Sequence, residues 1–279
     1  MRTIIAATDL NTASKQAIEF AAQIAATTGA KLVIFHAVHP MLSPPADPDT
    51  LTELKKTALA KIKRIGKKLI EKNEDLNVEY LCTIGLAADD LVFYAEKLHA
   101  GLIVTGMRRE TDLSDQIFGT VTTGLVRHSP VPVLCIHEKQ KYRDIKKIVF
   151  ASDFAPLKNK TIISELRKIA TSFNAEILIL HVFKNAGEIP DFEKAYEGLK
   201  IENALKGSRH SFHTVTDPDV VRGITTFAQQ HDADIVAMVP HDKPLLEKIF
   251  TRSASKKMAF RSNIPLLTFS DLQDRGGKE

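Results

Sequence analysis

The chain of 279 residues carries the same pattern twice. Residues 4–9 and 148–153 are short apolar runs that each end in a hydroxyl residue and an aspartate. The halves also close alike, because segments 129–134 and 262–267 each join a serine to a proline-containing apolar run. The length is that of two ordinary domains. The repeat therefore predicts two copies of one structural unit, and differences between the copies become evidence about function.

Each half alternates strand and helix patterns. In the first half, we predict strands at residues 3–8, 31–38, 78–84, 102–105 and 131–136, and helices at 12–28, 51–69, 88–98 and 120–128. Asn11 or Thr12 can cap the first helix and Gly29 ends it, and the prolines at 44, 45 and 48 mark a loop. In the second half, we predict strands at 148–152, 176–182, 211–215, 235–239 and 264–269, and helices at 160–172, 191–205, 220–230 and 254–260. Continuous apolar strands that alternate with helices are typical of buried parallel sheets.

The fold class that follows is α/β, with two tandem doubly wound sheets. Each would be a five-stranded, Rossmann-like parallel sheet of strand order 3-2-1-4-5 with helices on both faces. We expect one domain at residues 1–138 and another at 145–271, joined by the charged stretch 138–147. Strands 131–136 and 264–269 would each lie at an apolar sheet edge, and two such edges can pair as an intramolecular pseudo-dimer. Packing through helices is the alternative, and a homodimer of the whole chain stays open.

Composition narrows the function classes. Hydrophobic residues make up 44% and charged residues 26%, and no apolar stretch has the length of a membrane span. Asp9 interrupts the N-terminal apolar run too early for a secretion signal, so we expect a cytoplasmic protein without membrane contact. The cluster Lys61-Ile62-Lys63-Arg64 predicts a solvated helix face, and no nucleic-acid partner is expected. Cys82 and Cys135 lie in strand-like runs and are expected to be buried, reduced thiols.

A ligand crevice is expected where the strand order reverses, between the first and fourth strands of the first half. Asp9 ends the first strand and Gly106 ends the fourth, so the two would face each other there. Gly119-Thr120 begins the next helix, where free N–H groups and the helix dipole favour a phosphate. The carboxylate of Asp9 could accept hydrogen bonds from ribose hydroxyls.

At these positions the chain resembles the universal stress protein family in its tandem form, over nearly all of its length. The family's nucleotide motif is a glycine, two residues, a glycine, nine residues, and a glycine followed by serine or threonine. Gly106, Gly119 and Thr120 match at that spacing, whereas Arg109 occupies the position of the second glycine. The segment 127–134 is also similar to family members that hold ATP.

The resemblance implies an adenine-nucleotide site in the first domain only, with ATP as ligand and Mg²⁺ as a companion that could come with it. Asp9 would contact the ribose and Ala37 would lie against the adenine. The full set of implied site residues is Thr8, Asp9, Ala37, Gly106, Arg109, Gly119, Thr120, Val121 and Thr122.

Arg109 leaves three alternatives open. A side chain at a position that needs a left-handed backbone costs about 1–2 kcal/mol, and its bulk could block the phosphate. Arginine is also a good phosphate partner, so Arg108 and Arg109 could replace backbone contacts with charge. In the third alternative, Arg109 points to solvent.

The second half retains Asp153 and the pair His181-Val182, which echoes His36-Ala37. It has lost the glycines, because Pro240 replaces the first and Arg252-Ser253 replaces the final Gly-Thr. Proline lacks a backbone donor, so we predict no nucleotide in the family manner in this half. An isolated anion at the helix start is the alternative.

Signatures of catalysis and of metal binding are missing from the sequence. The pairs His36/His39 and His210/His213 are each three residues apart, a spacing that points to opposite faces of a strand. There is no P-loop, GxGxxG or GxSxG motif. We therefore expect a stress-response protein that binds its nucleotide and is not an enzyme, with weak ATPase activity left open. The alternative is an interaction or regulatory module of the same fold that binds no nucleotide.

Overall fold

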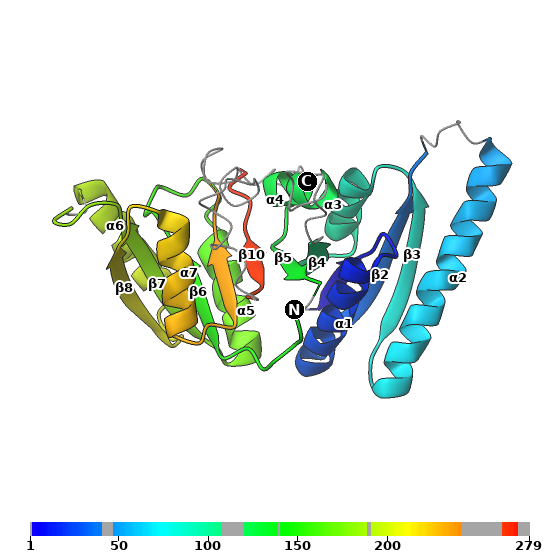
Figure 1. Ribbon diagram of the computed structural model, residues 1–279, viewed down its shortest axis with the longest axis horizontal. Coiled ribbons are helices and arrows are strands. Elements are labelled where there is room, and N and C mark those ends of the chain that lie inside the picture. Colours follow the sequence, from blue (N-terminus) through cyan, green and yellow to red (C-terminus); the bar gives the residue numbers. More distant parts are fainter. Residues whose placement is uncertain are drawn as a thin grey trace. The chain divides into compact units, whose positions relative to one another are not determined.

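The computed structural model describes residues 2–40, 47–107, 120–138, 140–188, 191–240 and 264–272 (Figure 1). The chain divides into two compact units. Among the described residues, the first unit ends at Tyr142 and the second begins at Arg143. Each unit is described by itself.

The first unit is a five-stranded parallel sheet of order β3-β2-β1-β4-β5. Its strands are β1 (Thr3–Ala7), β2 (Lys31–Val38), β3 (Val78–Ile84), β4 (Leu102–Met107) and β5 (Val133–His137). Its helices are α1 (Thr12–Thr28), α2 (Pro48–Lys72), α3 (Ala87–Lys97) and α4 (Thr120–His128). Helix α1 packs on β1, β4 and β5, and α2 packs on β2 and β3. Helices α3 and α4 pack on each other, with α3 on β2 and α4 on β4 and β5 (Figure 1).

The second unit repeats this order as β8-β7-β6-β9-β10, again with parallel pairs. Its strands are β6 (Lys147–Ala151), β7 (Glu176–Phe183), β8 (His210–Thr216), β9 (Ile235–Met238) and β10 (Leu266–Thr268). Its described helices are α5 (Ile162–Phe173), α6 (Phe192–Ala204) and α7 (Val220–Gln230). The predicted helix at 254–260 lies outside the described residues. The prediction of two doubly wound five-stranded sheets is confirmed.

The central strands show how the two copies keep one fold with different side chains. Ala6 on β1 is level with Val104 on β4, whereas the equivalent Phe150 on β6 is level with Ala237 on β9. All four side chains are buried. Neighbouring residues across a parallel pair share a face of the sheet, so a large residue on one strand is compensated by a small one beside it.

Local signals set both ends of α1, as predicted. Asn11 caps α1 by accepting a hydrogen bond from Ser14 N at 2.9 Å, and Gly29 ends the helix with φ 65°. The prediction that Pro48 belongs to a loop is wrong, because Pro48 is the first residue of α2. Proline has no N–H to lose at that position, and Asp47 caps the helix from outside.

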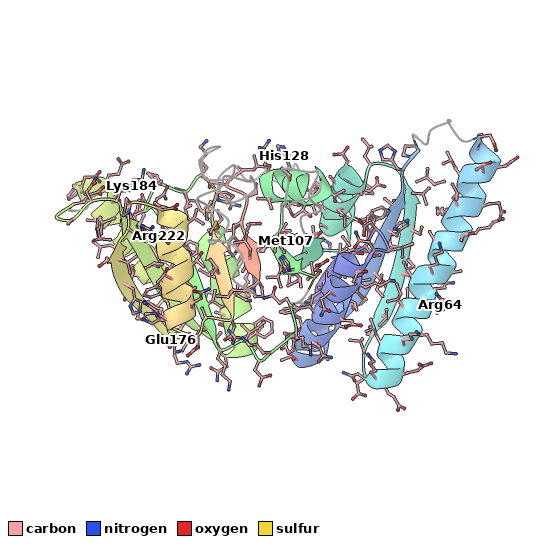
Figure 2. All side chains as sticks on the ribbon, in the orientation of Figure 1. Arg64, Met107, His128, Glu176, Lys184 and Arg222 are labelled. Carbon is pink, nitrogen blue, oxygen red and sulfur yellow. The ribbon has the colours of Figure 1, made fainter. Side chains whose placement is uncertain are left out.

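Two predicted strand limits also need correction. Gly106 does not end β4 but lies within it, because it pairs with Ile136 and the ladder continues to Met107 (Figure 2). Strand β5 begins at Val133 and not at residue 131, since Pro132 precedes it without a donor N–H.

Other composition-based predictions can be compared with the described residues. Arg64 and its neighbouring lysines on α2 are exposed and Ile62 is buried, which confirms a solvated basic face (Figure 2). Cys82 and Cys135 are buried free thiols, and burial raises the pKa of Cys135 strongly. No described helix is long and apolar enough to cross a membrane.

Candidate functional site

The strand order of the first unit reverses between β1 and β4. Ala6 is level with Ile34 on β2 and with Val104 on β4. Thr8, two residues further along, therefore reaches the level of Gly106 at the carboxyl edge of the sheet. In α/β sheets, ligands bind at this edge beside the reversal point. The structure thus places the Thr8-Asp9 segment and Gly106 where the sequence predicted a crevice.

The loop after β1 is held by its own side chains. Thr8 is buried, and its Oγ1 accepts a hydrogen bond from Leu10 N and lies within hydrogen-bonding distance of Ser14 Oγ, both at 2.9 Å. Asp9 is exposed and accepts hydrogen bonds from Asn11 N at 3.2 Å and from Asn11 Nδ2 at 2.6 Å. Leu10 has φ 68°, a left-handed backbone that is costly outside glycine. The surrounding hydrogen bonds hold this strained loop with the Asp9 carboxylate at its rim.

A histidine joins the end of β2 to this loop. His36 Nδ1 lies 2.7 Å from the backbone oxygen of Thr8. A carbonyl only accepts, so Nδ1 is the donor, and in the neutral ring Nε2 keeps its lone pair. Ala37 follows and is half-buried. The small side chain predicted to lie against adenine is therefore next to the residue that anchors the Asp9 loop.

Helix α4 starts close to the end of β4. The hydroxyls of Thr122 and Thr105 lie 3.2 Å apart and both side chains are buried, so Thr122 braces the helix start. Val121 is half-buried. Thr120 is the first residue of α4, but its side chain, together with Arg109 and Gly119, lies outside the described residues. The ligand roles given to these residues stay predictions.

The second unit repeats the backbone contacts of this loop. Ser152 Oγ accepts a hydrogen bond from Phe154 N at 3.1 Å, and Asp153 Oδ1 accepts one from Ala155 N at 3.0 Å. His181 Nδ1 donates to Ser152 O at 2.9 Å, and Phe154 has φ 56°. Sequence reasoning noticed the repeated aspartate and histidine but missed the left-handed residue between them.

Aromatic rings distinguish the second copy. The Phe154 ring stacks on His181 with centroids 5.2 Å apart and an interplanar angle of 21°. Phe183 meets the same imidazole edge-on at 4.6 Å, and Phe212 lies 6.3 Å from Phe154. Leu10 holds the equivalent position in the first unit. A ring stack therefore covers the histidine beside Val182, the counterpart of Ala37.

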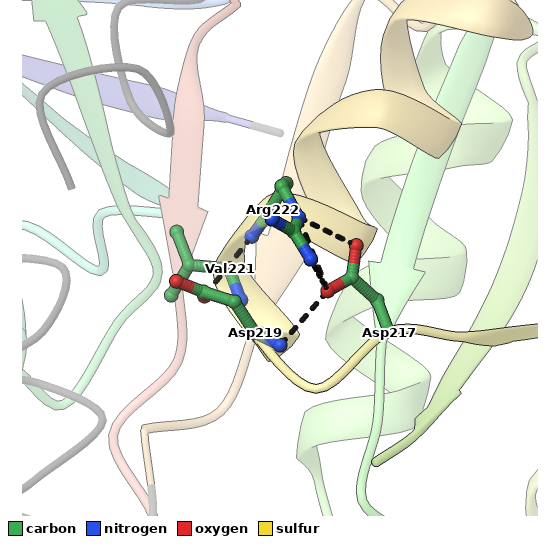
Figure 3. A network of polar contacts seen from close by, with 4 residues as sticks. All are labelled: Asp217, Asp219, Val221 and Arg222. Atoms are coloured by element: carbon green, nitrogen blue, oxygen red, sulfur yellow. Dashed lines mark hydrogen bonds and ion pairs between the residues drawn. The ribbon is translucent and has the colours of Figure 1, made fainter. Parts of the chain in front are cut away.

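A charged network closes the turn between β8 and α7 (Figure 3). Arg222 donates from Nε and Nη2 to the Asp217 carboxylate at 2.8 and 2.7 Å, and Asp219 N donates to it at 2.8 Å. These hydrogen bonds, led by that of Arg222, lower the pKa of Asp217.

A Cβ on Gly223 would lie 2.9 Å from Val182 Cγ1, so α7 packs directly over Val182.

The histidine pairs have separate partners. His210 Nε2 lies 3.0 Å from Glu202 Oε2, and His213 Nε2 lies 2.8 Å from Ser211 Oγ. Within the part of the chain that the structure describes, no three histidine, cysteine or acidic residues form a group that could hold a metal ion.

Comparisons with known proteins follow the same division of the chain. Residues 1–137 match the family model described as Universal stress protein family. Universal stress proteins of two Mycobacterium tuberculosis strains are 30% identical over 141 residues, which cover 49% of this chain and 96% of theirs. The chain belongs to the universal stress protein family.

Solved structures of the family extend the likeness in fold to both units. A universal stress protein from Archaeoglobus fulgidus has a TM-score of 0.70 at 16% identity, covering 97% of this chain and 98% of its own. A putative universal stress protein from Pseudomonas aeruginosa has a TM-score of 0.54 at 13% identity, covering 97% and 93%. The tandem form predicted from the internal repeat agrees with these two full-length matches.

Proposed function

We propose that the first unit binds an adenine nucleotide such as ATP and that the second is a degenerate partner domain without a nucleotide. One observation carries the proposal: the carboxyl edge of the second sheet has Val239 and Val182 where that of the first has the smaller Gly106 and Ala37. The first unit retains the sequence motif that ends in Gly119-Thr120. The second unit lacks those glycines and carries the Phe154–His181 stack.

Each part of the first unit has a proposed role. The exposed Asp9 carboxylate accepts hydrogen bonds from the ribose hydroxyls, and Ala37 leaves room for the base. The first N–H groups of α4 have no partner within the helix, and with the positive end of the helix dipole they favour phosphates. The positive charge of Arg109 would stabilise the negatively charged phosphates. Mg²⁺ could accompany the triphosphate.

We propose a cytoplasmic stress-response protein that binds its nucleotide without turning it over. The sequence carries no P-loop, GxGxxG or GxSxG motif, which supports binding without turnover. The alternative function is an interaction module without nucleotide. The exposed apolar residues Phe192, Tyr196 and Leu199 on α6 favour it.

Calorimetric titration of the full chain with ATP tests the proposal. We expect one nucleotide per chain, and an affinity at least about tenfold weaker for Gly119→Ala, since a Cβ there keeps the phosphate from the backbone. Gly198→Ala is the matched control, because its nearest neighbour is 3.9 Å away, in ordinary contact. Arg109→Gly decides the role of that arginine: weaker binding means that its charge helps, and tighter binding means that its bulk blocks.

Three results would reject parts of the proposal. A folded wild-type chain that binds no nucleotide rules out the first-unit site. Two nucleotides per chain rule out a degenerate second unit. Steady release of inorganic phosphate at one-site saturation shows that the protein is an ATPase.

A further inference from the structure

Helix α6 of the second unit turns its apolar side outward. Phe192, Tyr196 and Leu199 are 87%, 52% and 61% exposed. Their spacing of four and three residues places them on one face of the helix. The opposite face buries Glu197 and Ile201. An amphipathic helix that belongs only to its own domain would bury the aromatic side and expose the glutamate.

The exposed face is also ordered by contacts of its own. The rings of Phe192 and Tyr196 are parallel within 5°, with centroids 6.5 Å apart. Lys200 Nζ lies 4.6 Å above the Tyr196 ring and pairs with Glu197 at 2.6 Å. These side chains form a preorganised ladder, and a preorganised surface loses little entropy when a partner binds.

The equivalent helix of the first unit, α2, packs within its own domain. Helix α2 has 25 residues against 13 in α6, and it packs along β2 and β3. Gly66 of α2 sits so close to Tyr80 that a Cβ there would overlap the ring. Phe212 holds the position of Tyr80 in the second sheet and is 42% exposed. The second unit therefore leaves apolar surface uncovered on both a helix and an edge strand.

The charges beside the ladder indicate what covers it. Glu193 and Lys200 are seven residues apart, nearly two full turns, so they lie on the same flank of α6. Tyr196 lies near the midpoint between them. If two copies of α6 pack antiparallel about Tyr196, Glu193 of each copy meets Lys200 of the other. The Lys200 ammonium has three donors, and its bond to Glu197 uses one of them. A surface that is complementary to itself in this way is the mark of a two-fold interface.

The acidic residues on the other flank already have partners. Asp191 caps α6 by accepting a hydrogen bond from Lys194 N, and Glu202 pairs with His210. We propose that the stripe of Phe192, Tyr196 and Leu199 is a homodimer contact, in which α6 packs antiparallel on α6 of a second copy of this chain. Stable interfaces bury about 1,200–2,000 Å² in total. A single short helix and Phe212 offer less, so we expect a dimer that dissociates on dilution.

Sedimentation equilibrium of the full chain across a concentration series tests this proposal. We expect a monomer–dimer equilibrium that weakens by at least about tenfold in Leu199→Glu, because each copy then places a charge against the apolar stripe. Phe93→Glu on α3 is the matched control, since Phe93 is another exposed aromatic residue, and it should leave the equilibrium unchanged. Thermal melting checks that each variant is folded.

Charge exchange tests the antiparallel geometry. Glu193→Lys and Lys200→Glu should each weaken the dimer. Lys200→Glu also breaks the pair with Glu197 inside each copy, so the double variant should restore the loss seen in Glu193→Lys, because every cross-copy pair is again of opposite sign. A wild-type chain that is monomeric at high concentration overturns the proposal. A dimer that survives Leu199→Glu shows that another surface is used, and a double variant as weak as the single ones rules out the antiparallel pairing.

Discussion

The carboxyl edges of the two sheets show which features belong to the fold and which to a ligand. In both units a hydroxyl, an aspartate and a left-handed residue follow the first strand, and a histidine donates to the same backbone oxygen. This scaffold persists in the second unit, where the glycine motif is gone. The retention of Asp153 is therefore explained by loop structure alone. Evidence for a ligand has to come from what differs, namely Leu10 against Phe154 and Gly106 against Val239. The prediction that Pro240 replaces this glycine is wrong, because Val104 is equivalent to Ala237 and Gly106 therefore to Val239.

Exchanging core volume between the two units should have the largest effect. Phe150→Ala removes a fully buried ring beside Ala237 and should cost the second unit about 3–5 kcal/mol, through lost burial and the cavity that remains. Ala6→Phe places a ring beside Val104 in the first unit and should cost about 1–3 kcal/mol through overpacking. Hydrogen exchange of the core amides, followed by mass spectrometry, reports each unit separately.

The control for this comparison is the paired change in the second sheet. Phe150→Ala combined with Ala237→Val reproduces the first unit's arrangement and should recover part of the loss. If the double variant is as unstable as Phe150→Ala, the two positions do not compensate each other.

Exchanging the residues after the two aspartates tests the difference at the crevices. Leu10→Phe should weaken ATP binding by the first unit about tenfold, equal to about 1.4 kcal/mol, because a ring there can stack on His36 and crowd Ala37. Both residues already have a left-handed backbone, so the exchange adds no new strain. Titration calorimetry measures the affinity, with Phe154→Leu as the control that leaves it unchanged. Unaltered binding by Leu10→Phe would show that the ring stack is irrelevant to the nucleotide.

Much of the fold could be predicted because its signals are local or periodic. Apolar runs predicted the central strands of both sheets, and Asn11 and Gly29 predicted the ends of α1. The repeat itself predicted that the second sheet would copy the strand order of the first. The predicted limits of helices and strands were wrong where one residue type has two structural roles. Pro48 can begin a helix as well as interrupt one, and Gly106 pairs within β4 although glycine often follows a strand.

The details of the site were less accessible. The stack of Phe154 on His181 joins a residue of the loop after β6 to a residue of β7, 27 positions apart, and no short pattern encodes it. The spacing of Phe192, Tyr196 and Leu199 predicts an apolar helix face but not whether that face is turned inward. The left-handed residue was also missed: aligning the two copies places Leu10 and Phe154 at the same step after the aspartate, but neither residue type favours a positive φ.

The first helix of each unit, α1 or α5, begins with a different cap, and this difference has a smaller effect on stability. Asn11 caps α1, whereas Thr161 before α5 makes no capping hydrogen bond to its helix and bonds to Asn159 at 2.8 Å. Asn11→Ala should cost about 1 kcal/mol, and Thr161→Ala less than about 0.5 kcal/mol. Hydrogen exchange of the first-turn amides measures both. Equal protection losses in the two helices would contradict the assigned caps.

The smallest effect concerns two histidines on β8 where β3 carries Val78 and Leu81 at the equivalent positions. Desolvation acts to lower the pKa of His210, but hydrogen bonds to Ser208 O and Glu202, with the charge of Glu202, raise it overall. Desolvation first, and then the neighbouring His231, lower the pKa of His213. The two rings should therefore titrate on opposite sides of the usual value of 6.5.

The contributions of His210 and His213 to the stability of the second unit change with pH in opposite directions. The contribution of His210 is fully present below pH 6.5 and is lost as the pH rises through its raised folded pKa. The contribution of His213 is present above pH 6.5 and is lost as the pH falls through its lowered folded pKa. NMR titration of the ring protons measures both values, and Glu202→Gln should lower that of His210 while leaving His213 unchanged. If both rings shift together, the two histidines share one environment and the separate partners assigned to them are incorrect.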